Sequence, residues 1–127
     1  MNIPKGRNYT KTHEWVKTTG NIARVGITDF AQHELTDIVF AELPQEGARI
    51  KAGEQCVVVE SVKTAADVYA PISGRVVKIN QGVAEAPELI NSDSYGEGWL
   101  FEVEMSQTDE LNNLLTAEEY REITGEG

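Results

Sequence analysis

The hydrophobic positions of this chain form short runs, rich in β-branched and aromatic residues, separated by turn-forming residues. The runs span residues 9–17, 21–27, 37–43, 48–51, 56–59, 68–69, 75–79 and 99–105. β-branched and aromatic residues favour strands, and several short strands between turns predict an all-β sandwich or barrel. We expect the core to include Val57, Val59, Val76 and Ile79.

One polar cap predicts a short helix inside the β-rich part of the chain. Thr28 resembles an N-cap, and Asp29 would be favourable in the first turn after it. Residues 80–98 are rich in Asn, Gly, Ser, Pro and Asp, so we predict mostly loop there.

The pattern changes near the C-terminus, where two more short helices are predicted. Thr108 can cap a helix over residues 109–115, and Thr116 forms a capping box with Glu119 in front of a second one. Gly125 is a natural stop for that second helix. Both helices should pack on the outside of the β fold.

The runs at 56–59 and 68–69 flank a short polar segment that contains a single lysine, Lys63. This pattern predicts a β-hairpin with Lys63 at or beside its tip. The segment has no Gly and no Asn-Gly pair, so its residues do not define the turn type. An enzyme could reach a lysine at such a tip, although a solubilising surface lysine explains the pattern as well.

Composition indicates a soluble globular protein of 127 residues, with a single domain expected over residues 1–127. No apolar run approaches the ~20 residues of a membrane span. Residues 1–5 have neither an apolar signal core nor a transit-peptide character, so we expect a cytoplasmic location. Cys56 is the only cysteine, which excludes an internal disulfide, and no Cys/His grouping has metal-ligand spacing.

The formal net charge of −10 is unevenly distributed. From Ala84 onward there are twelve acids and one base, Arg121. Repulsion from phosphate argues against nucleic acid and against anionic membrane surfaces as partners. Electropositive proteins would be attracted. Simple solubility explains the charge about as well.

A longer string around Lys63 carries more information than the lysine alone. Glu60-Ser61-Val62-Lys63-Thr64-Ala65, followed by Asp67 and Ala70-Pro71-Ile72-Ser73-Gly74, closely resembles the lipoyl-attachment segment of glycine cleavage system H proteins. Other segments that look like H-protein signatures are His13-Glu14-Trp15-Val16, Val25-Gly26-Ile27-Thr28, Asp37-Ile38-Val39-Phe40, Gly98-Trp99-Leu100 and Glu118-Glu119-Tyr120. The resemblance implies a mainly β, lipoyl/biotinyl-type barrel-sandwich hybrid with short additional helices, including C-terminal ones, and a monomer.

The resemblance also implies a function as a carrier without catalytic residues or a metal of its own. Lipoic acid would be attached covalently to Lys63. The chain would then carry the aminomethyl group of glycine from glycine decarboxylase to an aminomethyltransferase, and dihydrolipoyl dehydrogenase would reoxidise the arm. Lipoyl-attaching enzymes would be further partners. The reactive chemistry belongs to the prosthetic group, so the protein needs no nucleophile or base.

Five more residues match family positions near the arm. Glu14 and Asp67, with Thr12 beside them, would line a cleft that holds the cationic amine and excludes water. Glu60 and Gly74 match positions associated with recognition by lipoyl-attaching enzymes. The alternatives are that Glu14 and Asp67 are ordinary surface acids and that Gly74 is a turn glycine.

Three positions depart from the family pattern. Thr36 stands where family members usually have Gly, and a positive φ there would strain threonine. Glu34 stands where the family often has histidine, with His33 one residue earlier, and Ser94 replaces a common loop proline. These departures affect the expected detail of the cleft and leave the attachment segment intact.

Three other functions compete with the shuttle. A lipoyl domain of a 2-oxoacid dehydrogenase or a biotin carrier typically has Asp-Lys-Ala or Met-Lys-Met, whereas this chain has Val62-Lys63-Thr64. A lipoyl donor or relay protein that serves 2-oxoacid dehydrogenases would have the same sequence features as the shuttle. An unmodified interaction module, with Lys63 incidental, is the third.

Overall fold

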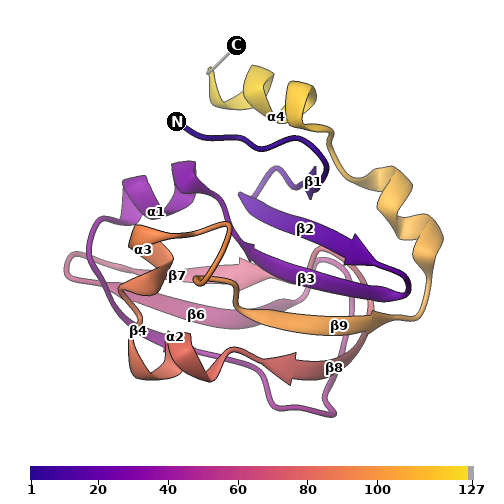
Figure 1. The fold of residues 1–127 in the computed structure, drawn as a ribbon, viewed down its shortest axis with the longest axis horizontal. Helices are drawn as coiled ribbons and strands as arrows, with labels where there is room; N and C mark the ends of the chain where they lie inside the picture. Colours follow the sequence, from indigo (N-terminus) through magenta and orange to yellow (C-terminus); the bar gives the residue numbers. More distant parts are fainter. Residues whose placement is uncertain (126–127) are drawn as a thin grey trace.

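The computed structural model describes residues 1–125 and consists of two antiparallel sheets with short helices around them (Figure 1). Glu126, one of the C-terminal acids counted above, lies outside the described residues. The larger sheet has the strand order β1 (Asn8–Tyr9), β2 (Glu14–Thr19), β3 (Ile22–Ile27), β9 (Phe101–Met105), β8 (Gly74–Ile79), β5 (Arg49–Ile50). The smaller sheet has the order β4 (Ile38–Glu42), β6 (Gln55–Ser61), β7 (Ala65–Tyr69).

Two strand pairs show how local sequence sets the register. The pairing of Thr19 with Ile22 joins β2 to β3 through a two-residue loop, and Gly20 in that loop has a φ of 61°. Two-residue hairpin loops need a positive φ, which glycine adopts without strain. In the second pair, β6 and β7 pair without a shift from Val57 opposite Val68 to Glu60 opposite Ala65, which confirms the predicted hairpin.

The main core lies between the sheets, and a second apolar cluster lies under the C-terminal helix. Val57, Val59 and Val76 are buried as predicted, while Ile79 is half-buried. The second cluster is made of Ile3, Tyr9, Trp15, Trp99, Ala117 and Tyr120. The mainly β architecture with short additional helices is therefore confirmed.

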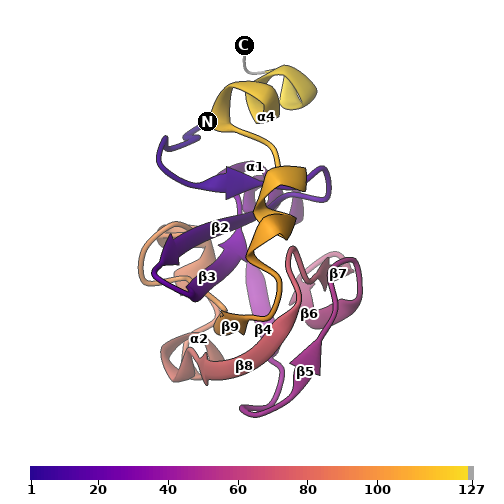
Figure 2. The same ribbon diagram turned by 90° about the vertical axis from the view of Figure 1, so that its right-hand side faces the viewer.

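Within residues 1–125, five short helical segments surround the sheets: α1 (Asp29–Leu35), α2 (Gln81–Glu85), α3 (Leu89–Ser92), the 3₁₀ helix η1 (Thr108–Asn113) and α4 (Ala117–Thr124). Thr28 caps α1, because its hydroxyl accepts a hydrogen bond from the Ala31 N–H at 3.2 Å. The capping box of Thr116 and Glu119 is present at α4, which Gly125 ends in the left-handed conformation. Figure 2 shows η1 and α4 outside the sheets.

The structure corrects three details of the sequence-based prediction. Residues 80–98 contain two short helices, α2 and α3, which are held by the burial of Val83 and Ile90 rather than by a periodic sequence pattern. The predicted run at 9–17 is broken, since β1 ends at Tyr9 and β2 begins at Glu14. The first C-terminal helix is a 3₁₀ helix and not an α-helix.

The C-terminal helix lies beside the N-terminal segment (Figures 1 and 2). The rings of Tyr120 and Tyr9 stack with centroids 4.9 Å apart, and an Arg121 Nη donates to the Ile3 carbonyl at 3.1 Å. The Tyr120 hydroxyl forms two further hydrogen bonds, with the His13 Nδ1 and with the Thr28 hydroxyl, each at 2.7 Å. The helix therefore supports the segment between β1 and β2, which forms one wall of the site described next.

Candidate functional site

Lys63 lies in the turn between β6 and β7, where Ser61 organises the backbone. The Ser61 N–H donates to the Thr64 carbonyl at 2.7 Å, and its hydroxyl accepts from the N–H groups of Lys63 (3.3 Å) and Thr64 (3.2 Å). Neither Val62 nor Lys63 has a positive φ. A serine side chain can thus close this turn without glycine, which explains why the sequence lacks the usual turn residues.

The tip is exposed and is anchored on one side. The Val62 N–H donates to the Asp37 carbonyl at 3.0 Å, which fixes the turn to the start of β4. Lys63 is exposed, and no group in residues 1–125 forms a hydrogen bond or ion pair with its ammonium. In Figure 1 this loop projects at the left edge of the molecule, below α1. The Lys63 amine is therefore accessible to another protein, whereas hydrogen bonds hold the backbone of the turn.

A cavity of about 300 Å³ lies on the β7 side of the hairpin. It is lined by the 12–14 segment, the end of β3, α1 and β7: Thr12, His13, Glu14, Ile27, Phe30, Ala31, Glu34, Leu35, Ala66, Asp67 and Val68. The three residues predicted for a cleft, Thr12, Glu14 and Asp67, all line it. The apolar lining from α1 could not be recognised from the sequence, because α1 and β7 are far apart along the chain.

Glu14 is the most constrained polar residue of this cavity. Its side chain is only 1% exposed, so the alternative that it is an ordinary surface acid is wrong. One carboxylate oxygen accepts from the hydroxyls of Thr10 and Thr12, each at 2.5 Å, and the other accepts from the Tyr69 N–H at 3.1 Å. Burial raises the pKa of Glu14, and these hydrogen bonds act in the opposite direction.

The hydrogen bonds of Glu14 leave one position for a ligand. An ionised carboxylate offers about four acceptor sites, of which three are taken here. Asp67 and Glu34 are exposed and add negative charge where the cavity meets solvent, so for Asp67 the surface-acid alternative remains open. An apolar wall with a buried carboxylate suits a ligand that has an apolar chain and a cationic end.

His13 lies at the same cavity but is committed to packing. It has a φ of 74°, its Nδ1 is 2.7 Å from the Tyr120 hydroxyl, and its ring centroid is 4.8 Å from that of Phe30. Burial lowers the pKa of His13, with an opposing effect from Glu34. Its contacts make it a structural link between α4 and α1.

The structure does not bring Gly74 or Glu60 to the cavity. Gly74 is buried in β8, and a Cβ added there would lie 2.1 Å from the Glu104 carbonyl oxygen on β9. Glycine at this position is therefore required by the close approach of β9. Glu60 is exposed beside the turn, between Phe40 on β4 and Ala65 on β7. Recognition of these two residues by another enzyme stays a prediction.

The departures from the family pattern have visible consequences. Thr36 ends α1 with a φ of 64°, so the expected strained conformation is present. Its carbonyl accepts from the Asn91 side chain at 2.7 Å, which helps to hold it. Glu34 lines the cavity and His33 does not, so this departure changes the charge of the cavity. Ser94 is buried, and its carbonyl accepts from the Trp15 indole at 3.0 Å.

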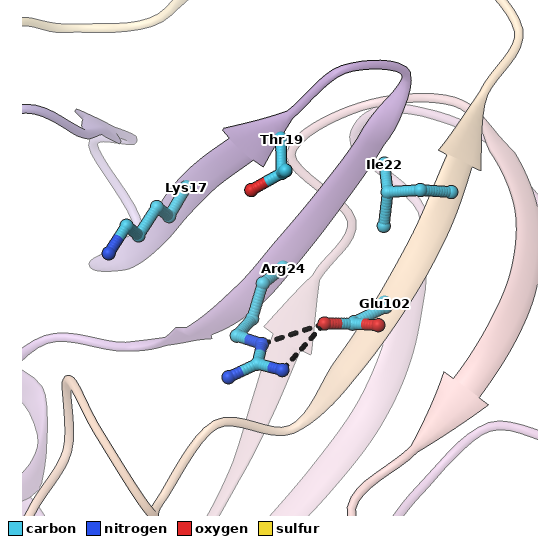
Figure 3. Close-up of a pocket in the computed structure, with 5 residues that line it drawn as sticks. All are labelled: Lys17, Thr19, Ile22, Arg24 and Glu102. Atoms are coloured by element: carbon cyan, nitrogen blue, oxygen red, sulfur yellow. Dashed lines mark hydrogen bonds and ion pairs between the residues drawn. The ribbon is translucent and has the colours of Figure 1, made fainter.

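A second depression lies on the exposed face of the larger sheet (Figure 3). Its volume is about 260 Å³, and it is lined by Lys17, Thr19, Ile22, Arg24 and Glu102. The Arg24 guanidinium bonds the Glu102 carboxylate at 2.8 Å and lies 4.3 Å from the centroid of the Trp99 ring. The charges of Arg24 and Glu102 are therefore paired with each other and are not free to bind a ligand.

Other classes of site find no support in the part of the chain that the structure describes. Residues 1–125 contain no group of three or more His, Cys, Asp or Glu side chains placed to bind a metal ion. Burial raises the pKa of the half-buried Cys56 thiol to about 12, with further effects from Glu14 and Glu54, so it is not a thiolate at neutral pH. No helix in residues 1–125 has the length and apolar character of a membrane span.

Comparison with known proteins gives one consistent result. Residues 7–127 match the family model of the glycine cleavage H-protein. The glycine cleavage system H protein of Carboxydothermus hydrogenoformans is 52% identical, over 98% of this chain and 95% of its own. That of Methylacidiphilum infernorum is 53% identical, over 97% and 96%. The crystal structure of a glycine cleavage system H protein from Mycobacterium marinum has a TM-score of 0.90 at 41% identity and covers 96% of this chain and 98% of that one.

Proposed function

Because this chain belongs to the glycine cleavage H-protein family, we propose that it is the lipoyl-carrying shuttle of the glycine cleavage system, with lipoic acid bound to Lys63. The observation that carries this proposal is the position of Lys63, exposed on a rigid turn beside a cavity with an apolar wall and a buried carboxylate. The chain acts as a non-catalytic carrier formed by a single domain.

The residues of the site fit a lipoyl group. When bound, that group supplies the disulfide that accepts and releases the aminomethyl cargo. Ser61 holds the backbone of the turn, in which Lys63 is exposed. Ile27, Phe30 and Leu35 provide an apolar wall that excludes water. Glu14 offers its remaining acceptor site to the cationic amine of the cargo.

The partners follow from this role. Glycine decarboxylase would load the chain, the aminomethyltransferase would unload it, dihydrolipoyl dehydrogenase would reoxidise it, and a lipoyl-attaching enzyme would first modify it. A net charge of −10 would attract electropositive surfaces of these proteins. No feature of residues 1–125 favours the alternative role as a lipoyl donor to 2-oxoacid dehydrogenases.

The test is a reconstituted glycine cleavage system in which this chain is the only carrier. After lipoylation it should support glycine-dependent release of CO₂ and transfer of the one-carbon unit to tetrahydrofolate. The Lys63→Arg variant should support neither, whereas Lys51→Arg, which changes another exposed lysine, should behave as wild type. Full activity of Lys63→Arg, or none of the lipoylated wild type, would refute the proposal.

A further inference from the structure

Exposed apolar side chains gather next to the Lys63 turn. Val62 is 67% exposed, Val39 55% and Phe40 48%. In residues 1–125 the other large apolar residues with this degree of exposure are Met1 and Ile123, near the two ends of the chain. We call Val39, Phe40 and Val62 the tip patch. Apolar residues that cluster on a surface mark interaction sites more often than scattered ones do.

Backbone pairing places the three residues of the tip patch on neighbouring segments. Ile38 pairs with Ser61 and Phe40 pairs with Glu60, so Val39 is the extra residue of a β-bulge in β4. The bulge exposes two consecutive residues, Val39 and Phe40, whereas a regular strand would turn one of them inward. The Val62 N–H bonds to the Asp37 carbonyl just before β4, which holds the third member beside them.

The tip patch and the cavity lie on opposite sides of the hairpin. The strand order is β4-β6-β7, with the patch on the β4 side and the cavity on the β7 side. Lys63 lies in the turn between the two. A protein bound at the tip patch would therefore have the lysine within its contact area and would leave the cavity open.

Charge restricts the occupant of the tip patch. The patch is bordered by the exposed acids Asp37, Glu42 and Glu60, and the whole chain has a net charge of −10. In a twofold dimer these acids would face their own copies, which disfavours a second copy of this chain. Anionic membrane surfaces are disfavoured for the same reason. The surface fits a protein that presents an apolar pocket with a basic rim.

We propose that the tip patch is the docking surface for the enzyme that attaches the lipoyl group to Lys63. This inference rests on the proposed function. The attaching enzyme meets the chain before any lipoyl arm exists, so it depends on protein surface next to the lysine, whereas enzymes that act later can also bind the arm. In the attachment step the neutral Lys63 amine attacks the carbonyl carbon of a lipoyl adenylate. An amide bond forms, the acyl–phosphate bond breaks, AMP leaves and the nitrogen releases a proton to water.

The experiment measures lipoylation of the unmodified chain. Purified chain at increasing concentration is mixed with lipoate, ATP and a lipoate–protein ligase, and intact mass gives the initial rate of modification. Phe40→Ser and Val62→Thr remove apolar character from the patch, and both positions are exposed, so both variants should fold. Ile123→Ser is the matched control, because Ile123 is 49% exposed but lies on α4. Thermal unfolding checks the fold of each variant.

We expect kcat/KM for lipoylation to fall by at least about tenfold in Phe40→Ser, as for a central interface anchor, chiefly through KM. Val62→Thr should also lose rate, and Ile123→Ser should stay within twofold of wild type. Wild-type rates in both patch variants would overturn this inference while the proposed function stands. An equal loss in Ile123→Ser, or a dimer that Phe40→Ser dissociates, would also overturn it. A wild type that is not modified at Lys63 would overturn both proposals.

Discussion

Replacing Glu14 by glutamine should shorten the lifetime of the protein that carries the aminomethyl cargo. The Glu14 carboxylate is 1% exposed and uses three acceptor sites within the protein, so it can give one charge-assisted hydrogen bond to the cationic amine. A hydrogen bond to a charged group contributes ~1.5–3 kcal/mol. At ~1.36 kcal/mol per tenfold change, its loss corresponds to roughly a 10- to 100-fold faster release, if the arm must leave the cavity before hydrolysis.

Glutamine is preferable to alanine because it keeps the local structure. Its carbonyl can still accept from the Tyr69 N–H, and its amide can donate to the hydroxyls of Thr10 and Thr12, which then accept. Glu14→Ala would leave these groups without an acceptor at a cost of ~1–3 kcal/mol in the free energy of unfolding.

The assay follows ammonia or formaldehyde released at neutral pH from the isolated, loaded protein. Lipoylation of Lys63 should be unchanged in Glu14→Gln, as intact mass will show, because Glu14 is buried away from the turn. Glu85→Gln, an exposed change on α2 outside the cavity, is the control and should decay at the wild-type rate. If Glu14→Gln and Asp67→Asn both decay at the wild-type rate, these carboxylates do not protect the cargo, and other residues must do so.

Three further predictions follow from contacts around the site. Gly74→Ala should destabilise the fold by ~1–3 kcal/mol in thermal unfolding, because its Cβ would lie 2.1 Å from the Glu104 carbonyl oxygen; unchanged stability would contradict the packing role. Tyr120→Phe should cost ~1–3 kcal/mol in denaturant unfolding, since His13 and Thr28 lose a shared partner at 2.7 Å; a wild-type midpoint would contradict this. Burial lowers the pKa of His13, so the unfolded chain takes up its proton more readily, and the free energy of unfolding should fall as pH drops below ~6.5 toward the lower folded pKa. His13→Asn, which tolerates the φ of 74°, should flatten that slope, and an unchanged slope would show that other groups cause it.

The elements that the sequence predicted are those fixed by local chemistry. The capping box at Thr116 and the turn at Gly20 depend on neighbouring residues, and both are present. The helices α2 and α3 were missed because they are five and four residues long and depend on the distant contacts that bury Val83 and Ile90. A helix that short is not stable in isolation, so its local sequence carries no clear helical signal.

The family resemblance identifies residues of the site, but it does not predict features that depend on tertiary packing. The family resemblance indicates Lys63, Thr12, Glu14 and Asp67, and the structure places the last three in one cavity. The burial of Glu14 could not be read from the sequence, because one of its partners, the Tyr69 N–H, is 55 residues away. The exposure of Phe40 could not be predicted from the sequence either, because the apolar run around it gives no sign of a bulge.

We expect Lys63 to be the one lysine, among the six in the chain, that carries the lipoyl group. The most direct test is peptide mapping by mass spectrometry of protein purified from cells supplied with lipoate. We expect one lipoyl group per chain, on the peptide that contains Lys63, and none in the Lys63→Arg variant. A lipoyl group on Lys51 or Lys78 in the wild type, or an unmodified chain under these conditions, would contradict it.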